Sequence, residues 1–472
     1  MTPYRVRRSK SFLLLMATCL SMHALKAQDS THLALSAKEC VDYAMKNTVQ
    51  VKNALLAIQI QQQSNKEITS AALPQVSGSV DANYYPKVPV QSFPNFIAAA
   101  TYGVLEQEGV KNGTGTPIIS PKDFGFIQAQ FGTKYTGSVG VGLSQLLFDG
   151  QVFVGLQARE ASIKYATKTA EVTQVQIKAN VYKVYYQLVV GKRQIGTVDA
   201  NIERTEKLLH DTKAFYTNGF AEKLDVDKVE VTLANLRTER VKLDNTLKNG
   251  LLGLKLLIGM PIRNELTLTD TLSEAQLKTN ILDTSYNYSD RKEYEQAEWL
   301  KRLNEYNIKR YQLSKLPTVA LLGSFSKNAQ RNKFNFFDFN EDWFTTALIG
   351  VKVSVPIFEG LAKNARISKA RLELQQTENM MDVLKLSIDN EVETARTSLQ
   401  SAFVSMDFQQ KNMVLAENVY NQTKLKYEQG LGSNLEITNA NAELRTAQIN
   451  YYSALYDAII AKVDFLTATG KL

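Results

Sequence analysis

Four segments of this chain alternate apolar and polar residues over about ten positions each. In the first of them, Val76, Val80 and Tyr84 fall on one face, whereas Ser77 and Asp81 fall on the other. A period of two is typical of β-strands with one apolar face. We therefore expect strands at about 74–85, 134–148, 317–327 and 345–358. Lipid-facing barrel strands and a soluble half-buried sheet share this period, so the strands alone leave both interpretations open.

Two much longer stretches have the character of helices. Residues 151–216 and 361–427 contain no proline, and at about 1.5 Å per residue each helix would approach 100 Å. Such a helix cannot be buried within one globular domain. Each stretch leads through a glycine turn into a second helix whose apolar residues recur every three or four positions, as Leu444, Ala447 and Tyr451 do. This heptad spacing predicts coiled-coil hairpins at 151–258 and 361–468.

The chain is two copies of one unit. Residues 141–150 align with 351–360, and Tyr216, Gly219 and Leu224 reappear 211 positions later as Tyr427, Gly430 and Leu435. We therefore divide the chain into a first repeat at 28–260, a linker at 261–290 and a second repeat at 291–472. The first repeat carries a longer loop, 86–130, which is rich in Pro and Gly and is expected to be irregular.

The N-terminus has the features of an export signal. Basic residues precede an apolar stretch from Phe12 to Leu20, and Ala27 supplies a small residue for cleavage, so residues 1–27 are predicted to be a signal peptide. Cys19 follows a poor lipobox, which disfavours lipidation. Cys40 is then the only thiol, and no internal disulfide is expected.

The formal charge of +8 is mostly due to this signal. Residues 1–27 hold five basic residues and no acidic one, so the rest of the chain carries 50 basic against 47 acidic residues. Nearly balanced charge without a basic cluster argues against nucleic-acid binding. No later window offers 18 consecutive apolar residues, so entry into a membrane would have to be as a β-barrel.

Four strands cannot close a barrel, because the smallest membrane barrels have about eight. Oligomerisation must supply the other strands, and three copies would give about 12 while gathering the long helices around a hollow axis. The pattern alone does not exclude two copies. The predicted fold class is mostly α with a membrane β-barrel, in which each chain adds four strands and long coiled-coil hairpins.

The chain resembles the TolC-like outer-membrane efflux protein family over nearly its whole length. The resemblance is carried by 355–360 with Ala370 downstream, the turn 427–430 with 435–437 after it, 290–292, and Leu73-Pro74 entering a strand. It implies a homotrimer with a 12-stranded barrel in outer-membrane lipid, a periplasmic helical tunnel and a belt near its midpoint. It also implies two partners, a periplasmic adaptor and an inner-membrane pump.

Glycines mark the points where the chain changes direction. Gly150 and Gly360 lie where a strand passes into a helix, at a corner that favours tolerance of unusual backbone angles. Gly219 and Gly430 are expected to end the long helices at the tip that, in the family, meets the adaptor. The candidate adaptor contacts are Leu224, Asp225, Leu435 and Glu436, although capping and packing explain these residues equally well.

Some family members narrow the tunnel with acidic side chains just before the second tip glycine. Here Asn421 and Lys424 occupy the closest positions, and the nearest acid is Glu417. These three residues are the gate candidates, and the departure puts an acidic, cation-selecting ring in doubt. Within the barrel, Asp81, Asn83 and Lys352 are expected to face water, and the aromatic residues at 334–343 either mark the membrane interface or pack their loop.

Catalytic chemistry has no support in the sequence. After residue 27 the chain has only His32 and His210, no cysteine pair, no metal-binding helix motif and no phosphate loop. We therefore expect neither an enzyme nor a cofactor, which disfavours a secreted hydrolase. The main alternative to a channel is a soluble periplasmic coiled-coil adaptor or scaffold, which would need no strands that face lipid.

Overall fold

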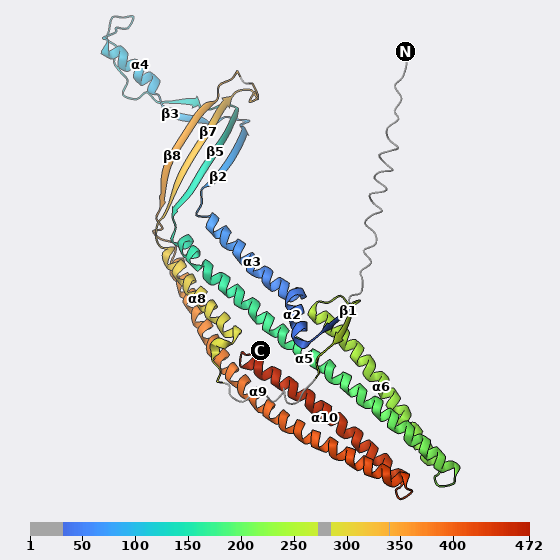
Figure 1. Ribbon diagram of the computed structural model, residues 1–472. Coiled ribbons are helices and arrows are strands. Elements are labelled where there is room, and N and C mark those ends of the chain that lie inside the picture. The colour runs from blue at the N-terminus through green and yellow to red at the C-terminus, as the bar shows by residue number, and fades with distance from the viewer. Residues whose placement is uncertain (1–31, 272–284, 339) are drawn as a thin grey trace, which may run out of the picture. The chain divides into compact units, whose positions relative to one another are not determined.

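The computed structural model describes residues 32–271, 285–338 and 340–472 (Figure 1). The predicted signal peptide and Cys19 lie outside these residues, as does part of the predicted linker 261–290. Two compact units are present, and each draws on both sequence repeats. Among the described residues, the first unit contains residues 32–61, 161–271, 285–302 and 375–472, and the second contains residues 62–160, 303–338 and 340–374.

Helices dominate the first unit, and several continue into the second. The two longest, α5 and α9, have 68 and 67 residues, and their ends agree to within one residue with the stretches predicted from the absence of proline. The helices are α2 (Ala37–Asn47), α3 (Val49–Ser70), α5 (Gly150–Thr217), α6 (Lys223–Ile258), α8 (Lys292–Leu313), α9 (Ala362–Glu428) and α10 (Asn434–Ala468), with a short 3-10 turn, η2 (Tyr288–Asp290).

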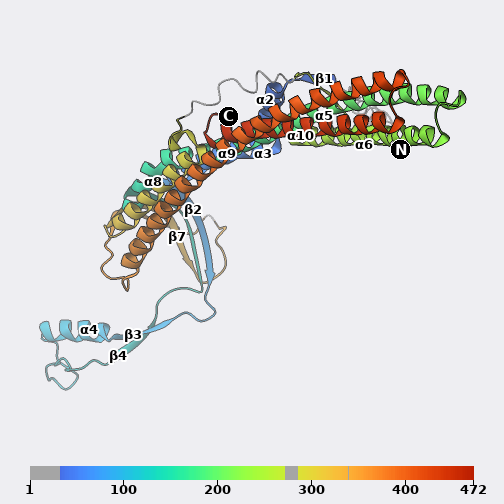
Figure 2. The ribbon, with the colours of Figure 1, turned by 90° about the horizontal axis from the view of Figure 1, so that it is seen from below.

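Near the tips, α5, α6, α9 and α10 share one apolar core, and Figure 2 shows them running alongside one another. Tyr420 and Ile437 are fully buried there between residues from the other two helices, Leu208 and Val229. The predicted seam of α10 is buried along its whole length, at Ala440, Leu444, Ala447, Tyr451, Ala454, Ala458, Ala461 and Phe465. Small residues on this seam let the helices approach closely, as expected for coiled coils.

A second core lies at the other end of the first unit. There β1 (His32–Leu35) pairs in parallel with β6 (Glu265–Leu268), a short sheet that the sequence pattern did not predict. Cys40 and Val51 pack beneath it against Tyr185 and Ile258. Both strands have only four residues, too few for a period of two to stand out.

The second unit is built on a four-stranded antiparallel sheet in the order β2-β5-β7-β8. Its strands are β2 (Gln75–Tyr84), β5 (Tyr135–Phe148), β7 (Thr318–Arg331) and β8 (Phe344–Ser354). β2 and β8 are the edge strands, and each has one row of backbone groups without a partner strand among the residues that the structure describes. A register shift between Leu146 and Phe148 bends β5 where it approaches α5.

The loop 86–130 is more ordered than the sequence indicated. It contains an antiparallel pair, β3 (Val90–Pro94) with β4 (Phe126–Gln130), and the helix α4 (Phe96–Gln107) between them. The Asn95 side chain caps α4 by accepting a hydrogen bond from the Ala98 backbone N–H at 3.0 Å. Most of the Pro and Gly residues that suggested irregularity lie outside these elements, and Pro94 is the last residue of β3, while the run from Phe96 to Ala100 favours a helix.

The two corner glycines have different structural reasons. Gly360 has φ +59°, the left-handed backbone expected at a corner, and Leu361 follows with φ +64°. Gly150 has no such angle, so the expectation of an unusual backbone was wrong there. A Cβ atom at Gly150 would instead lie 2.6 Å from the backbone O of Leu313, because α5 begins directly against the end of α8.

This close approach gives the first prediction. Gly150→Ala should destabilise the protein by about 1–3 kcal/mol, since the atom in the way belongs to the backbone and cannot rotate aside. Gly196→Ala in the same helix is the matched control, because a Cβ there meets no atom within 4 Å and the change should stabilise by roughly 0.5–1 kcal/mol. Denaturant unfolding in detergent measures both, and equal effects would contradict the packing argument.

Candidate functional site: tips, sheet faces and a buried arginine

Both predicted tip glycines end their helices in the left-handed conformation. Gly219 has φ +79° and Gly430 has φ +74°. The backbone N–H of Gly219 donates to Tyr216 O and that of Phe220 donates to Phe215 O, the two bonds of a Schellman motif. Gly430 and Leu431 repeat the same two bonds one sequence repeat later. The two tips are therefore copies of one turn.

Asp225 connects the first tip to the second. Its carboxylate accepts a hydrogen bond from the Glu222 backbone N–H at 3.4 Å, and the Asn434 side chain donates to the Asp225 backbone O at 3.4 Å. The side-chain amide of Asn434, the Glu222 N–H and nearby Lys228 together hold the pKa of Asp225 below its usual value. Because Asn434 opens α10, Asp225 both caps α6 and holds the neighbouring tip.

Exposed apolar side chains gather at the two tips. Leu224 and Leu435 are mostly exposed, and Glu436 is exposed while its backbone N–H donates to the Ser433 hydroxyl at 3.2 Å. Sequence reasoning missed Phe220 and Leu431, which directly follow the tip glycines and are even more exposed. Their equivalent places in the two repeats were the signal that could have identified them. Exposed apolar clusters of this kind are typical of docking surfaces.

The three gate candidates lie along one side of α9, separated by four and then three residues. Glu417 and Asn421 are exposed, and Lys424 is half-buried. The ammonium of Lys424 lies 3.8 Å from the Glu428 carboxylate, which also lies 3.7 Å from the Lys207 ammonium on α5. The Glu428 carboxylate is therefore shared by two cations from different hairpins, and its negative charge lowers the electrostatic repulsion between Lys424 and other cations nearby.

A polar seam joins the two hairpins beyond the tips. The Asn201 side chain donates to the Gln448 carbonyl at 2.8 Å in a buried contact, and the hydroxyls of Thr212 and Tyr427 lie 3.0 Å apart. Sequence analysis gave no indication of these pairs, because their partners lie more than 200 positions apart. Buried polar pairs of this kind have their hydrogen-bonding capacity satisfied only in one arrangement of the helices.

The predicted lumen residues share one face of the sheet. Asp81 lies opposite Ser138 and accepts a hydrogen bond from its hydroxyl at 3.1 Å, and Asn83 lies opposite Thr136. The register carries the same face across β7 to Lys352, which pairs with Ala320. Residues directly opposite in an antiparallel pair point to the same side, so Asp81, Asn83 and Lys352 face one direction.

The other face of the sheet is apolar and exposed. Val80 on β2 is 76% exposed and Ile349 on β8 is 85% exposed. Large apolar side chains with high exposure continue across the face, at Val76, Tyr84, Val139, Val141, Phe325, Val351 and Val353. No other part of the described chain covers this band, and its size is typical of a surface that contacts lipid or another protein.

Aromatic rings cluster at the end of the sheet where β2 leads into the loop 86–130, which is called the excursion from here on. Tyr84 stacks on Tyr135 at 4.9 Å, and Tyr135 contacts Phe334 at 5.8 Å. Phe336 continues the cluster from Phe334 to Trp343. Phe339, which the sequence also placed here, lies outside the described residues. Rings at one end of an apolar band are typical of the membrane–water interface.

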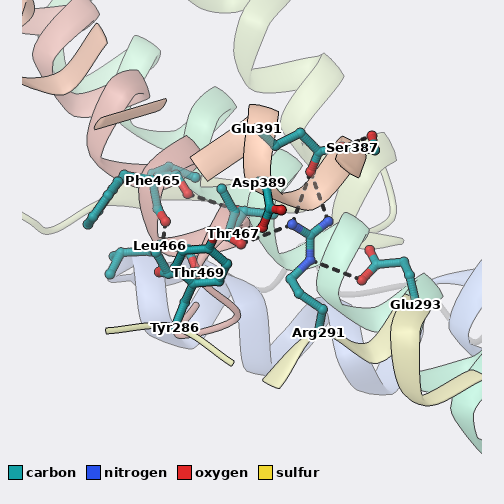
Figure 3. Close-up of polar contacts among 12 residues, drawn as sticks. Tyr286, Arg291, Glu293, Ser387, Asp389, Glu391, Phe465, Leu466, Thr467 and Thr469 are labelled. Carbon is teal, nitrogen blue, oxygen red and sulfur yellow. Dashed lines mark hydrogen bonds and ion pairs between the residues drawn. The ribbon is translucent and has the colours of Figure 1, made fainter. Parts of the chain in front are cut away.

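Arg291, at the start of the second repeat, is a buried cation whose role the sequence did not indicate (Figure 3). Its guanidinium donates two hydrogen bonds to Glu391 on α9 at 3.0 Å and one to the Ala468 backbone O on α10 at 2.9 Å, and its Nε donates to Glu293 at 3.2 Å. Planar guanidinium geometry suits such multiple contacts. Arg291 therefore ties the beginning of α8 to both helices of the second hairpin.

A carboxylate beside Arg291 holds the chain that leads into it. Asp389 accepts hydrogen bonds from Tyr286 at 2.6 Å and from Tyr288 at 3.0 Å. The bond to Asp389 raises the pKa of Tyr286 to about 12, so both phenols remain donors in neutral solution. The segment 286–291 is thus fixed on α9 by two tyrosines and an arginine.

The described residues form neither a metal-ligand cluster nor a membrane-spanning helix. Among residues 32–271, 285–338 and 340–472, no group of three or more His, Cys, Asp or Glu side chains is placed to hold a metal ion. Over the same ranges, no helix combines the length and the apolar character that crossing a membrane requires.

Comparison with known proteins gives consistent matches. The model of a family described as outer membrane efflux protein matches residues 41–260 and 289–471. Outer membrane efflux protein BepC of Brucella suis biovar 1 is 27% identical over 167 residues, which span 35% of this chain and only 36% of BepC. Outer membrane protein TolC of Vibrio cholerae is 19% identical over 340 residues, 71% of this chain and 77% of that protein.

Solved structures give the same fold. The crystal structure of CusC superposes with a TM-score of 0.73 at 15% identity, and the match covers 95% of each chain. At this identity the likeness concerns the fold alone. It confirms the predicted fold class, in which long helical hairpins continue from a set of four strands.

The linked tips give the second prediction. A lowered pKa means that the Asp225 carboxylate stabilises the tip above its unfolded value of 3.8, and that this stability is lost as the pH falls through the lower folded value. Asp225→Asn should therefore loosen residues 218–228 at pH 7 by about 0.5–1 kcal/mol, and its effect should shrink progressively as the pH falls below 3.8. Hydrogen exchange corrected for intrinsic rates measures this effect. The exposed Asp227 provides the control variant Asp227→Asn, and equal loosening by both would contradict the assignment.

Proposed function

We propose that three copies of this chain, which belongs to the outer membrane efflux protein family, form one passive duct. This duct leads from the periplasm to the exterior. The protein is an outer-membrane efflux channel protein of Gram-negative bacteria, and the alternative of a soluble periplasmic adaptor is excluded. Its assembly, partners and gate are the proposals argued below.

The proposal of a trimer rests on the four-stranded sheet, whose edge strands β2 and β8 each lack one partner strand among the described residues. Three antiparallel steps from β2 to β8 leave the two edge strands antiparallel to each other. β8 of one copy can therefore pair with β2 of the next in the same antiparallel sense, and three copies close a ring of twelve strands. The exposed apolar face of Val80 and Ile349 would then contact lipid, and Asp81, Asn83 and Lys352 would line the water-filled interior.

The helical hairpins continue this duct on the periplasmic side. With three copies around one axis, α5, α6, α9 and α10 of each chain would supply the twelve long helices of a tunnel wall. The repeats at 28–260 and 291–472 would each contribute one hairpin, with the linker 261–290 contributing to a belt. The buried Arg291 contacts support such a belt, because they fix the start of the second repeat on α9 and α10.

The tips are the proposed contact with a periplasmic adaptor, which would connect the duct to an inner-membrane pump. Leu224 and Leu435, with Phe220 and Leu431 beside them, offer an exposed apolar surface. Gly219 and Gly430 set the turns that present it, while Asp225 and Glu436 add acidic groups at its edge. An apolar centre with a polar rim is the usual composition of a protein interface.

Glu417, Asn421 and Lys424 are the proposed gate, because they follow one side of α9 in its last turns before the tip. Three Lys424 side chains around an axis would repel one another. Glu428 lies within 4 Å of Lys424 and reduces this cost, so a closed tip can hold the three cations.

The trimer is tested by joining the strand edges covalently. Val80→Cys on β2, combined with cysteines placed one at a time from Thr345 to Val353 on β8, should give a covalent trimer at the native register. Cys40 will not interfere, because burial raises the pKa of its thiol to about 12. Denaturing gels report the products.

Single-cysteine variants are the controls for this experiment and should give no trimer. A ladder that ends at the dimer for every β8 position would refute three-fold closure. Disulfides formed only within one chain would also refute it, because β2 and β8 would then pair with each other.

The gate is tested by reversing one charge. Lys424→Glu should shift the selectivity of single channels in planar bilayers toward cations, because each copy then places an acid beside Glu428 at the narrowest point. Lys426→Glu makes the same charge change on the opposite side of α9 and should change selectivity much less. Unchanged selectivity and conductance after Lys424→Glu would remove Lys424 from the gate and leave Glu417 as the next candidate.

A further inference from the structure

The helix α4 in the excursion after β2 has one face covered by its own chain. Ala98 and Leu105 are half-buried on this side. The ring of Tyr102 lies 5.7 Å from that of Phe124, and the Glu106 carboxylate accepts a hydrogen bond from the Ser120 backbone N–H at 3.2 Å. The loop after α4 therefore folds back on the helix and satisfies its one charged side chain.

The opposite face of α4 has no partner among the described residues. Phe96, Ile97, Ala100 and Val104 fall within about 100° of one another around the helix axis. All four are exposed, Ile97 to 55% and Val104 to 60%. No charged residue lies on this face, and such a concentration of exposed apolar side chains is typical of a surface that is covered in use.

The chain connects this face to the outer end of the sheet. The excursion begins directly after Tyr84, whose ring stacks on Tyr135 in the aromatic cluster. Beside that cluster the apolar face of the sheet ends, so the membrane–water interface lies at this level if the sheet spans the membrane. The excursion leaves the sheet where an interfacial segment would have to begin, and it carries further exposed apolar residues at Val90 and Phe126.

We propose that α4 is a membrane-surface anchor: it lies in the outer-leaflet interface of the outer membrane, with Phe96, Ile97, Ala100 and Val104 against the acyl-chain boundary. This inference rests on the proposed function, since it requires the sheet to span that membrane. Interfacial helices bind through such an apolar face. The polar contact of α4 with its own loop, between Glu106 and Ser120, then lies on the side away from the lipid.

A second copy of the chain fits this face less well. Four side chains, one of them alanine, offer a few hundred Å² at most, whereas specific protein interfaces bury roughly 1,200–2,000 Å². The face also carries no charged residue, so it offers no ion pairs of the kind that give such interfaces their specificity. A lipid interface needs no such pairs, because it accepts an apolar surface of any shape.

The test uses an environment-sensitive dye on single cysteines of the full chain, reconstituted in vesicles of phospholipid and lipopolysaccharide that contain nitroxide-labelled lipid. Ile97→Cys reports on α4, and Ile349→Cys reports on the sheet face. Gly113→Cys, where a Cβ meets no atom within 4 Å, is the water-exposed control in the same excursion. Dye at Ile97 and at Ile349 should be quenched at least threefold more than dye at Gly113.

The outcomes separate the anchor from the proposed function. Quenching at Ile349 with none at Ile97 beyond the Gly113 level overturns the anchor and leaves the channel intact. Absence of quenching at both positions overturns the channel and the anchor together. A disulfide between the Ile97→Cys positions of two copies would place the face between protomers and overturn the anchor. Val104→Cys on the same face repeats the measurement if Ile97→Cys does not assemble.

Discussion

The unpaired backbone groups along β2 and β8 are the constraint on which the rest of the structure depends. In water these edges could remain solvated, but in a bilayer every N–H and C=O without a partner costs several kcal/mol. The described part of one chain supplies four strands to this sheet and leaves both of its edges without a partner strand. If the sheet enters lipid as proposed, it requires strands from other copies, and the proposed assembly then follows from hydrogen bonding more than from any specific side-chain contact.

Duplication explains how one chain meets this constraint and also builds a long helical body. Each repeat supplies two strands and one hairpin, and β5 pairs with β7 across the repeat boundary to make one sheet. The same duplication gives two tip turns with identical bonding, at Gly219 and Gly430. Arg291 marks the join, because its contacts with Glu391 and Ala468 hold the start of the second repeat against the end of the chain.

Local periodicity and the long proline-free stretches predicted the strands and helices of this fold, and they failed where contacts are distant. The seam of α10 could be predicted because Leu444, Tyr451 and Phe465 repeat at heptad spacing, and the strands because their faces alternate. The close approach of Gly150 to Leu313 could not be predicted, because it depends on how α5 meets α8. The contacts of Arg291 with Glu391 and Ala468 could not be predicted either, because these acceptors lie 100 and 177 positions away in the sequence.

The tip residues were chosen correctly as turns, but their surroundings came only from the structure. Gly219 and Gly430 follow from the rule that a left-handed glycine ends a helix. The hydrogen bond from Asn434 to Asp225 and the sharing of Glu428 by Lys207 and Lys424 each join two hairpins. A single sequence does not indicate which residues on different hairpins lie close together, so it contains no signal for such pairs. The exposed residues Phe220 and Leu431, in contrast, could have been found from their equivalent positions in the two repeats.

The polar contacts between the hairpins solve a problem that the apolar seams create. A heptad seam repeats, so two hairpins packed only through Ala and Leu could slide by seven residues, about 10 Å, and find similar packing. In the observed antiparallel register Asn201 bonds Gln448 and Thr197 contacts Tyr452. A slide of one heptad in one direction would place Asn201 against Leu455 and Gln448 against Leu208, burying both amides without partners.

Sliding in the other direction would separate Thr197 from Tyr452 and break the ion pair between Lys183 and Asp464. The apolar residues thus supply most of the attraction between the helices, while a few polar side chains at unrepeated positions determine the register. This register also sets the height of one tip relative to the other, because both turns lie at the ends of the helices that it aligns. The hydrogen bond between Asn434 and the Asp225 backbone can form only when those heights agree.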